Sequence, residues 1–576
     1  MTAKKATSKG KKQGKKKTAV NEPMHQPEWL PESLLETQDE TAASDLPPSF
    51  HDPFIRKPGV LAIVALALGL LFDFLFWDQV VGVNFAIFIT IVIFGGILWL
   101  TWEGKRPRAS SLWLLLPFLF FDVFSFIRNE PLTRSLSFVG ILFSTGVLAS
   151  TYIGGRWMEY GLSDYLSKYF LLIANVLSGG ISLAADTRKY QLESDSAKPQ
   201  IPVWALLRGL LIALPIVACF ASLLAAGDVV FNQKLQDFFD FEDLGEFIWR
   251  SFTVLFWAYI IVGVFRHAAL HSRDNELIRE GKSAVKPFLG FTETAVILAC
   301  VSGLFLIFVV IQFQYFFGGQ TNIGVEGYTY SQYARRGFNE LVTVAFLSLV
   351  LILGLSSVTR RETDQQKRTY SWLSAFLVAL VLVILISAYQ RISLAIDWHG
   401  YSRLRLYPRI FLIWLALLLV AVIVLEIIRK ERYFAFAAVV ASVGFAVTLT
   451  LFNVDAAIVK YNIPRVLNGK WINVGHLASL STDAVPVLVD EFLSKKYALS
   501  DHEKIGAALT CYLHFMPEEV DEDWQSFNLS QRRAEDALQR IEPALQEYGI
   551  NDEKWPVRAR TPGGSLYDCR YYGYEE

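Results

Sequence analysis

The chain has 576 residues, of which 53% are hydrophobic and only 19% are charged, and its formal net charge at pH 7 is −1. These proportions, together with 43 Phe and 15 Trp, exclude an ordinary soluble protein of this length. Long apolar runs separated by short polar loops indicate a multi-pass membrane protein instead.

The first segment, residues 1–55, is predicted to be a disordered Lys-rich and Pro-rich tail. Eight lysines fall within the first 17 residues, and residues 18–58 are rich in proline and acidic side chains. Such a sequence cannot bury enough apolar surface to offset its ordering entropy. Because the first apolar run begins about forty residues behind the lysines, we expect no cleaved signal peptide. The lysines could attract anionic lipid of the inner leaflet, or they could remain solvated.

Residues 56–454 are predicted to form an all-α, polytopic transmembrane bundle. A helix needs roughly 20 apolar residues to cross a hydrocarbon core of ~30 Å. About eleven such runs are present. They lie near 59–78, 83–102, 112–127, 133–154, 203–226, 247–266, 291–316, 339–358, 370–389, 408–428 and 433–452. The apolar segment 166–185 carries Asn175, Gly179 and Gly180, so we interpret it as an interfacial or re-entrant helix and not as a twelfth span.

Lysine and arginine residues predict the orientation, because they gather in short cytoplasmic loops. With eleven spans, the basic loops all fall on the side of the N-terminal tail, and the acidic loop 228–246 falls on the other side. The basic segments are 105–108, 266–286, 360–368 and 429–432. We therefore predict a multi-pass protein of the cell (plasma or inner) membrane with its N-terminus in the cytoplasm and its C-terminus outside.

Residues 455–576 are predicted to form a small, polar, mainly helical C-terminal domain. They contain 20 Asp and Glu against 13 Lys and Arg, which argues against nucleic acid as a partner. Helices are expected near 483–496, 501–515 and 530–548. Cys511 and Cys569 could form a disulfide if the domain lies outside, or they could be two free thiols.

Ionisable side chains within the spans mark the candidate site, because each is costly to bury in a bilayer. Most of them map to the predicted outer half. We predict an outer-face polar cluster of Asp73, Asp122, Arg250, Tyr333, Arg335, Arg336, Glu340, Arg391, Asp397 and His399. A cavity or groove open to the outside is the functional interpretation. Interfacial anchors and helix-end ion pairs, such as Arg336 with Glu340, are the structural alternative.

Several polar stretches carry a resemblance to known families. They include Tyr333-Ala-Arg-Arg-Gly-Phe-Asn-Glu-Leu341, the run from Arg391 through Tyr401 to Arg405, Asn453-Val-Asp455 through Arg465, and the sequence HLASLSTDAVP at 476–486. With them the chain resembles the bacterial integral-membrane families described as domains of unknown function 4173 and 4153. The resemblance extends from about residue 60 to residue 490. It implies the architecture and implies no activity.

Catalytic signatures do not appear in the sequence. It has no HExxH motif, no phosphate-binding loop with its lysine and no GxSxG elbow, so no catalytic residue, cofactor or metal is predicted. His267 and His271 are four residues apart and could place two metal ligands on one helix face, but a basic interfacial turn explains them better.

Three functions remain open. The first is an envelope-facing structural or signalling component, which would meet an envelope protein partner through its outer loops and C-terminal domain. The second is a transporter or permease with an outward-facing polar cavity. The third is a membrane-embedded enzyme that acts on a lipid-linked substrate, with Arg335, Arg336 and Arg391 holding an anion. We prefer the first because it requires no unobserved chemistry.

Overall fold

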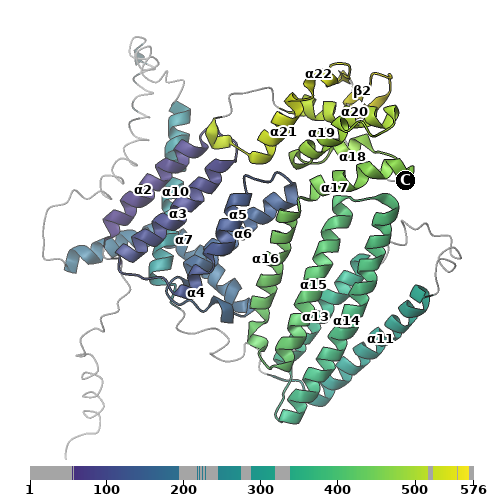
Figure 1. Ribbon diagram of the computed structural model, residues 1–576. Helices are drawn as coiled ribbons and strands as arrows, with labels where there is room; N and C mark the ends of the chain where they lie inside the picture. Colours follow the sequence, from purple (N-terminus) through teal and green to yellow (C-terminus); the bar gives the residue numbers. More distant parts are fainter. Residues whose placement is uncertain are drawn as a thin grey trace, which may run out of the picture. The chain divides into compact units, whose positions relative to one another are not determined.

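The computed structural model describes residue 55 and residues 57–193, 217, 220, 224, 227–228, 244–273, 287–317, 338–516, 523–553 and 555–569 (Figure 1). Nearly all of the predicted N-terminal tail therefore lies outside the described residues, as does most of the predicted span at 203–226. Residues from Ile55 onward belong to one compact unit.

Nine helices in these described ranges are long and apolar enough to cross a membrane. They are α2 (Pro58–Phe76), α3 (Val83–Trp102), α6 (Pro131–Thr151), α10 (Leu244–Leu270), α11 (Phe291–Phe317), α13 (Phe338–Val358), α14 (Asp364–His399), α15 (Arg403–Ile427) and α16 (Phe434–Phe452). The predicted all-α, polytopic architecture is thereby confirmed. The predicted span at 112–127 corresponds to two shorter helices, α4 (Ala109–Leu112) and α5 (Leu115–Phe124).

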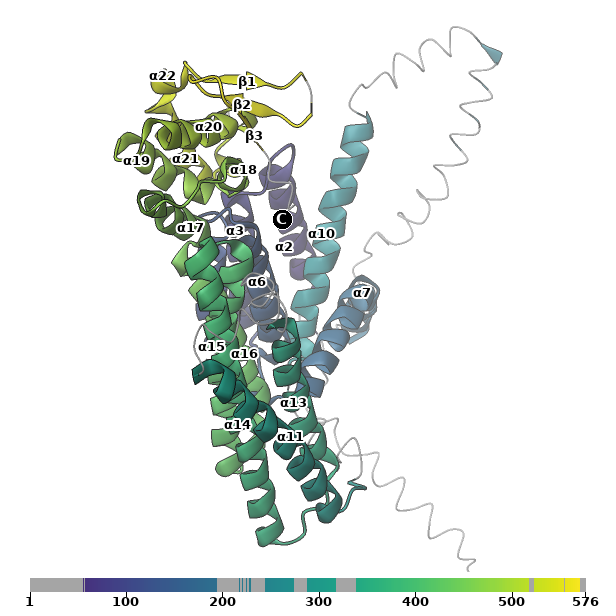
Figure 2. The ribbon, with the colours of Figure 1, turned by 90° about the vertical axis from the view of Figure 1, so that its right-hand side faces the viewer.

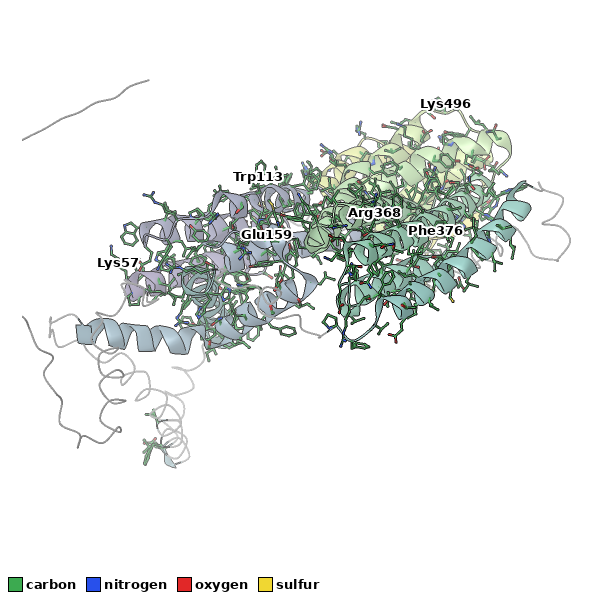
Figure 3. The ribbon with its side chains drawn as sticks, turned by 90° about the horizontal axis from the view of Figure 1, so that it is seen from below. Lys57, Trp113, Glu159, Arg368, Phe376 and Lys496 are labelled. Carbon is green, nitrogen blue, oxygen red and sulfur yellow. A yellow bond between two sulfur atoms is a disulfide. The ribbon has the colours of Figure 1, made fainter. Side chains whose placement is uncertain are left out.

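Apolar side chains on the membrane helices lie in two different environments. Some pack between helices, whereas others, such as Trp113 and Phe376, are 64% and 47% exposed (Figure 3). Such apolar surface is expected where a helix faces lipid rather than water.

The helices α2, α3 and α10 share one apolar core, which includes Leu61, Phe88 and Phe265 (Figure 1). Helix α7 (Leu162–Glu193) contains the segment 166–185 and crosses α10 at a pair of glycines. A Cβ atom added to Gly263 would lie 2.6 Å from the Cα atom of Val176. Small residues thus allow the two backbones to approach closely, as is common between helices in membranes.

A second core joins α11, α13, α14 and α15, which run side by side in both ribbon views (Figures 1 and 2). Its buried members include Leu298, Ile352, Leu377 and Leu419. Helix α14 has 36 residues and therefore extends beyond its predicted apolar core of 370–389 at both ends. A third core, with Phe118, Ile141 and Ala446, connects α5, α6 and α16.

The C-terminal region is built mainly from short helices. They are α17 (Val454–Asn462), α18 (Val474–Ala478), α19 (Val485–Leu493), α20 (Leu499–Phe515), α21 (Leu529–Gln539) and α22 (Glu542–Leu545). Short 3-10 turns also occur in the described parts of the chain: η2 (Trp157–Glu159), η4 (Glu431–Tyr433), η5 (Ile463–Asn468), η6 (Thr482–Ala484) and η7 (Trp524–Ser526). The apolar core of this region also contains Leu406 of α15 and Leu449 of α16, so it continues into the ends of two spans.

Two features of the C-terminal region differ from the sequence prediction. The helix predicted at 530–548 is two helices, and Pro543 lies in the first turn of the second. Residues 549–568, for which no structure was predicted, contain an antiparallel sheet of β1 (Gly549–Asn551), β2 (Arg558–Arg560) and β3 (Leu566–Asp568). Cys511 in α20 and Cys569 directly after β3 form a disulfide, so one of the two alternatives for these cysteines is realised.

Candidate functional site

Two members of the predicted outer-face cluster, Asp73 and Arg250, form an ion pair between α2 and α10. The Nη2 atom of Arg250 lies 2.7 Å from Oδ2 of Asp73, and its Nε atom is 3.1 Å from the same oxygen. Glu246, one turn earlier in α10, lies 3.3 Å from the guanidinium, which also lies 4.9 Å from the ring of Trp77. A groove of about 700 Å³ adjoins this pair. The pair has the features of a helix-end ion pair and also borders an accessible space.

Asp122 is a separate polar site between α5 and α3. It is 3% exposed, and its Oδ2 atom accepts a hydrogen bond of 2.7 Å from Thr90. Its Oδ1 atom is buried and has no hydrogen-bond partner among the described residues. Buried carboxylate oxygens are nearly always satisfied, so this atom is a place where a proton, water or solute could interact.

The other predicted members lie elsewhere. Arg391 in α14 donates a hydrogen bond of 2.9 Å to Gln312 of α11. Asp397 and His399 are exposed near the end of α14, and Glu340 is exposed near the start of α13. Tyr333, Arg335 and Arg336 lie outside the described residues. The described members therefore occupy several different sites, and of these members only Asp73 and Arg250 contact one another through an ion pair.

A buried polar junction, which the sequence analysis did not predict, connects the spans with the C-terminal region. Its first element is a bidentate ion pair between Arg403, at the start of α15, and Asp455, in α17. The Nε–Oδ1 distance is 2.8 Å and the Nη2–Oδ2 distance is 2.5 Å. Asp455 is fully buried, and its Oδ2 atom also accepts a hydrogen bond of 2.7 Å from the backbone N–H of Ser481.

The second element of the junction is Asp483, in the turn η6. Its Oδ2 atom accepts hydrogen bonds of 2.9 Å from the backbone N–H groups of Asn129 and Glu130, which lie in the turn between α5 and α6. Arg128 of the same turn lies 3.6 Å from the other oxygen. Burial raises the pKa of Asp483, and these hydrogen bonds and Arg128 lower it in part. A carboxylate of the C-terminal region thus binds the turn of a transmembrane hairpin.

Glu130 connects these two elements. Its carboxylate caps the start of α6 by accepting hydrogen bonds from the backbone N–H groups of Leu132, at 3.0 Å, and Thr133, at 2.7 Å. The hydroxyl of Tyr407, one turn after Arg403, donates a further hydrogen bond to Glu130. Helices α6 and α15 are therefore joined beside the ion pair.

A second contact area lies between the loop after α2 and the segment 523–530. The backbone N–H of Val83 donates to the carbonyl oxygen of Phe527 at 2.9 Å, and Gln79 donates to Asp523 at 2.8 Å. The N–H of Leu529 donates to the carbonyl of Phe126 at 2.8 Å. Two interhelical loops of the membrane part thus contact the C-terminal region at several points.

The sequence did contain a signal for this junction. Asp455, Ser481 and Asp483 all lie in the two stretches, 453–455 and 476–486, that were singled out for their family resemblance. The partner of Asp455, Arg403, lies 52 residues earlier, in the stretch from Arg391 to Arg405 that carries the same resemblance, but the pairing of the two required the fold. Hydropathy also places these residues outside the spans, where an acidic side chain appears ordinary.

The described residues contain no cluster of three or more His, Cys, Asp or Glu side chains placed to hold a metal ion. The His267 and His271 rings stack with their centroids 5.8 Å apart. The Nδ1 atom of His267 lies 3.2 Å from the amide nitrogen of Asn175 in α7. These contacts assign His267 to the packing of α7 against α10.

Comparison with known protein families gives a match over most of the transmembrane part. The family model described as "Domain of unknown function (DUF4153)" matches residues 113–491, which is more than half of the chain. The match begins after the first two spans and ends within α19, so it includes both acidic residues of the buried polar junction. No curated protein and no solved structure matches the chain.

Proposed function

This chain belongs to the DUF4153 family, and we propose that it is an envelope-facing structural or signalling component of the cell membrane. In this role the spans hold the C-terminal region in one orientation toward an envelope protein partner. The observation that carries the proposal is the buried polar junction, in which Arg403 binds Asp455 and Asp483 binds the turn at 128–130.

A flexibly tethered domain would not need such a junction. Burying the charge of Asp455 carries a desolvation cost of several kcal/mol, and the ion pair offsets it only with good geometry and further hydrogen bonds. Asp455 has both, since it binds Arg403 through two atoms and accepts from Ser481. A buried ion pair adds little net stability compared with apolar packing, so we infer that this one serves to fix the geometry of the C-terminal region.

Two observations support an orientation with the C-terminus outside. The Cys511–Cys569 disulfide is typical of an oxidising, non-cytoplasmic compartment. At the helix ends that face away from the C-terminal region, Arg360 follows α13, Lys367 lies in the first turn of α14 and Arg429 follows α15. Basic residues of this kind are expected on the cytoplasmic side. Both observations favour the same arrangement, with the C-terminal region outside.

Cysteine labelling in cells tests this orientation. Ser565 is exposed beside β3, and Arg368 is exposed near the start of α14. In a background with Cys219→Ser and Cys300→Ser, we expect a membrane-impermeant maleimide to label Ser565→Cys in intact cells and Arg368→Cys only after permeabilisation. The reverse pattern would place the C-terminal region in the cytoplasm and exclude the envelope-facing role.

Site-directed cross-linking tests for the partner. A photo-reactive residue at Leu566 or Trp555, which are 49% and 65% exposed, is expected to give an adduct with an envelope protein in cells. The buried position Ala537 is the matched control and should give none. If no exposed position on the C-terminal region gives an adduct, and deletion of the protein leaves envelope-stress responses unchanged, the proposal fails.

A transporter is the second candidate, and one observation favours it. The buried Oδ1 atom of Asp122 has no hydrogen-bond partner among the described residues, as a proton- or cation-binding carboxylate in a bundle would require. Solute uptake that is the same in Asp122→Asn cells and wild-type cells would remove this candidate.

A further inference from the structure

A basic pocket of about 520 Å³ lies where α13 and α15 end and α14 begins. Arg360 follows α13, Lys367 lies in the first turn of α14, and Arg429 follows α15. The pocket therefore lies at the level where these spans leave the apolar part of the bilayer. We propose that it binds the phosphate ester of an anionic phospholipid headgroup.

Arg361 forms the preordered part of this pocket. Its Nη2 atom donates to the carbonyl oxygen of Ser356 at 2.8 Å and to the hydroxyl of the same residue at 2.9 Å. The guanidinium also lies 4.5 Å from the ring of Tyr370 and 3.8 Å from Glu426, and its side chain is 15% exposed. A cation held in this way loses little conformational entropy when a ligand binds.

The rim of the pocket carries cations that can turn toward a ligand. Lys367 and Arg429 each lie 3.5 Å from Asp364, whose side chain is 83% exposed. Ion pairs exposed to this extent are weak, so a phosphate can compete for both cations. Arg360 lines the pocket and donates from Nε to the carbonyl oxygen of Pro287 at 2.7 Å.

The backbone at Arg429 provides independent support. Its φ angle is +56°, in the left-handed region that glycine usually occupies just after a helix. A side chain at this position costs conformational energy. Strain of this kind is typical of sites where a particular side chain is required, and Arg429 supplies a cation to the rim of the pocket.

The charges identify the class of ligand. Arg360, Arg361, Lys367 and Arg429 face three carboxylates, those of Glu362, Asp364 and Glu426, so the site is positive by one formal charge. A phosphodiester carries one negative charge. Basic pockets between spans on the cytoplasmic side are typical binding sites for anionic headgroups. The leaflet rests on the proposed orientation, whereas the pocket and its ligand class do not.

Lipid titration of the full-length protein in neutral detergent tests the proposal, with binding followed by native mass spectrometry. We expect phosphatidylglycerol to bind and phosphatidylcholine not to bind. Arg360→Gln and Lys367→Gln should each weaken binding roughly 5-fold, and together about 30-fold. Arg368→Gln is the matched control, because Arg368 is exposed next to Lys367 and does not line the pocket (Figure 3). Equal binding of the two lipids, or wild-type affinity in the double variant, would overturn the proposal.

Two further experiments distinguish a lipid from a soluble phosphate ester and weakened binding from misfolding. Soluble glycerol phosphate that displaces phosphatidylglycerol at similar concentrations would support the phosphate chemistry and assign it to a soluble ester instead of a lipid. Arg429→Gly relieves the positive φ angle, so we expect a melting temperature at or above that of wild type together with weaker phosphatidylglycerol binding. Misfolding cannot produce that combination, and undiminished binding by this variant would count against the site.

Discussion

Arg403 and Asp455 form a bidentate ion pair across 52 residues of sequence, with one partner at the start of a span and the other fully buried beside the C-terminal core. Because the pair joins two parts of the chain, its loss should destabilise both the transmembrane part and the C-terminal region.

Replacing one partner is therefore expected to be costly. Asp455→Asn should lower the free energy of unfolding by about 3–5 kcal/mol, because the Arg403 charge is left without its carboxylate. Thermal unfolding in detergent and limited proteolysis of the C-terminal region measure this effect. Arg558→Gln is the control, since both side chains of the Arg558–Asp568 pair are 47% exposed and its loss should cost less than about 1 kcal/mol. Equal effects of the two variants would refute a structural role for the buried pair.

The junction should also respond to pH through Asp483. Burial raises its pKa above the ordinary 3.8, so the folded protein holds this proton in a pH range where the unfolded chain has released it. The contribution of this group to stability is then largest below pH 3.8 and falls as the pH rises through the folded-state pKa. Relative to Asp483→Asn, the wild-type melting temperature should therefore rise as the pH is lowered toward 3.8. A difference that is constant with pH would show that this carboxyl does not titrate abnormally.

The disulfide should contribute strongly to the C-terminal region. It closes a loop with a sequence separation of 58 residues, for which chain entropy gives about 4 kcal/mol of stabilisation. Cys511→Ala with Cys569→Ala, or reduction of the wild type, is expected to lower the unfolding temperature of this region. Reductant should have no further effect on the double variant. A wild-type protein that is insensitive to reductant would contradict the expectation.

Close packing of α7 on α10 can be tested by replacing the glycine of α10 at which the two helices cross. Gly263→Ala should destabilise the protein, because the new Cβ atom would lie 2.6 Å from the Cα of Val176. Gly303→Ala in α11 is the control, since nothing lies within 4 Å of the added atom, and alanine should improve the helix by up to about 1 kcal/mol. Melting temperatures of the two purified variants decide the matter, and a stabilised Gly263→Ala variant would disprove the tight crossing.

Hydropathy predicted most of the described spans because a bilayer imposes a strong and local rule on sequence. Helix α14 shows its limit, since the run 370–389 marks the apolar part of a helix that extends from Asp364 to His399. The extra turns at 364–369 are polar and those at 390–399 mix polar with apolar residues, and the capping box of Thr363 and Gln366 together with Gly400 sets the ends. Hydropathy does not detect those signals.

The polar contacts were much harder to predict than the helices. Asp73 and Arg250 were both selected because they lie in spans, although their pairing required the fold. Asp455 and Asp483 were overlooked as site residues because acidic side chains outside a membrane are usually solvated. The sheet at 549–568 was missed because strands of three residues are too short to show an alternating pattern.

The length of α14 has a consequence for how this helix is coupled to the C-terminal region. At 1.5 Å per residue, its 36 residues extend about 54 Å, well beyond the ~30 Å of a hydrocarbon core. Tilting absorbs part of the excess, and the remainder projects past the headgroups. Arg465 holds that projecting end, donating to the carbonyl oxygen of Asp397 at 2.5 Å. Arg465 belongs to η5 of the C-terminal region, so a change in the tilt of α14 would also reorient that region.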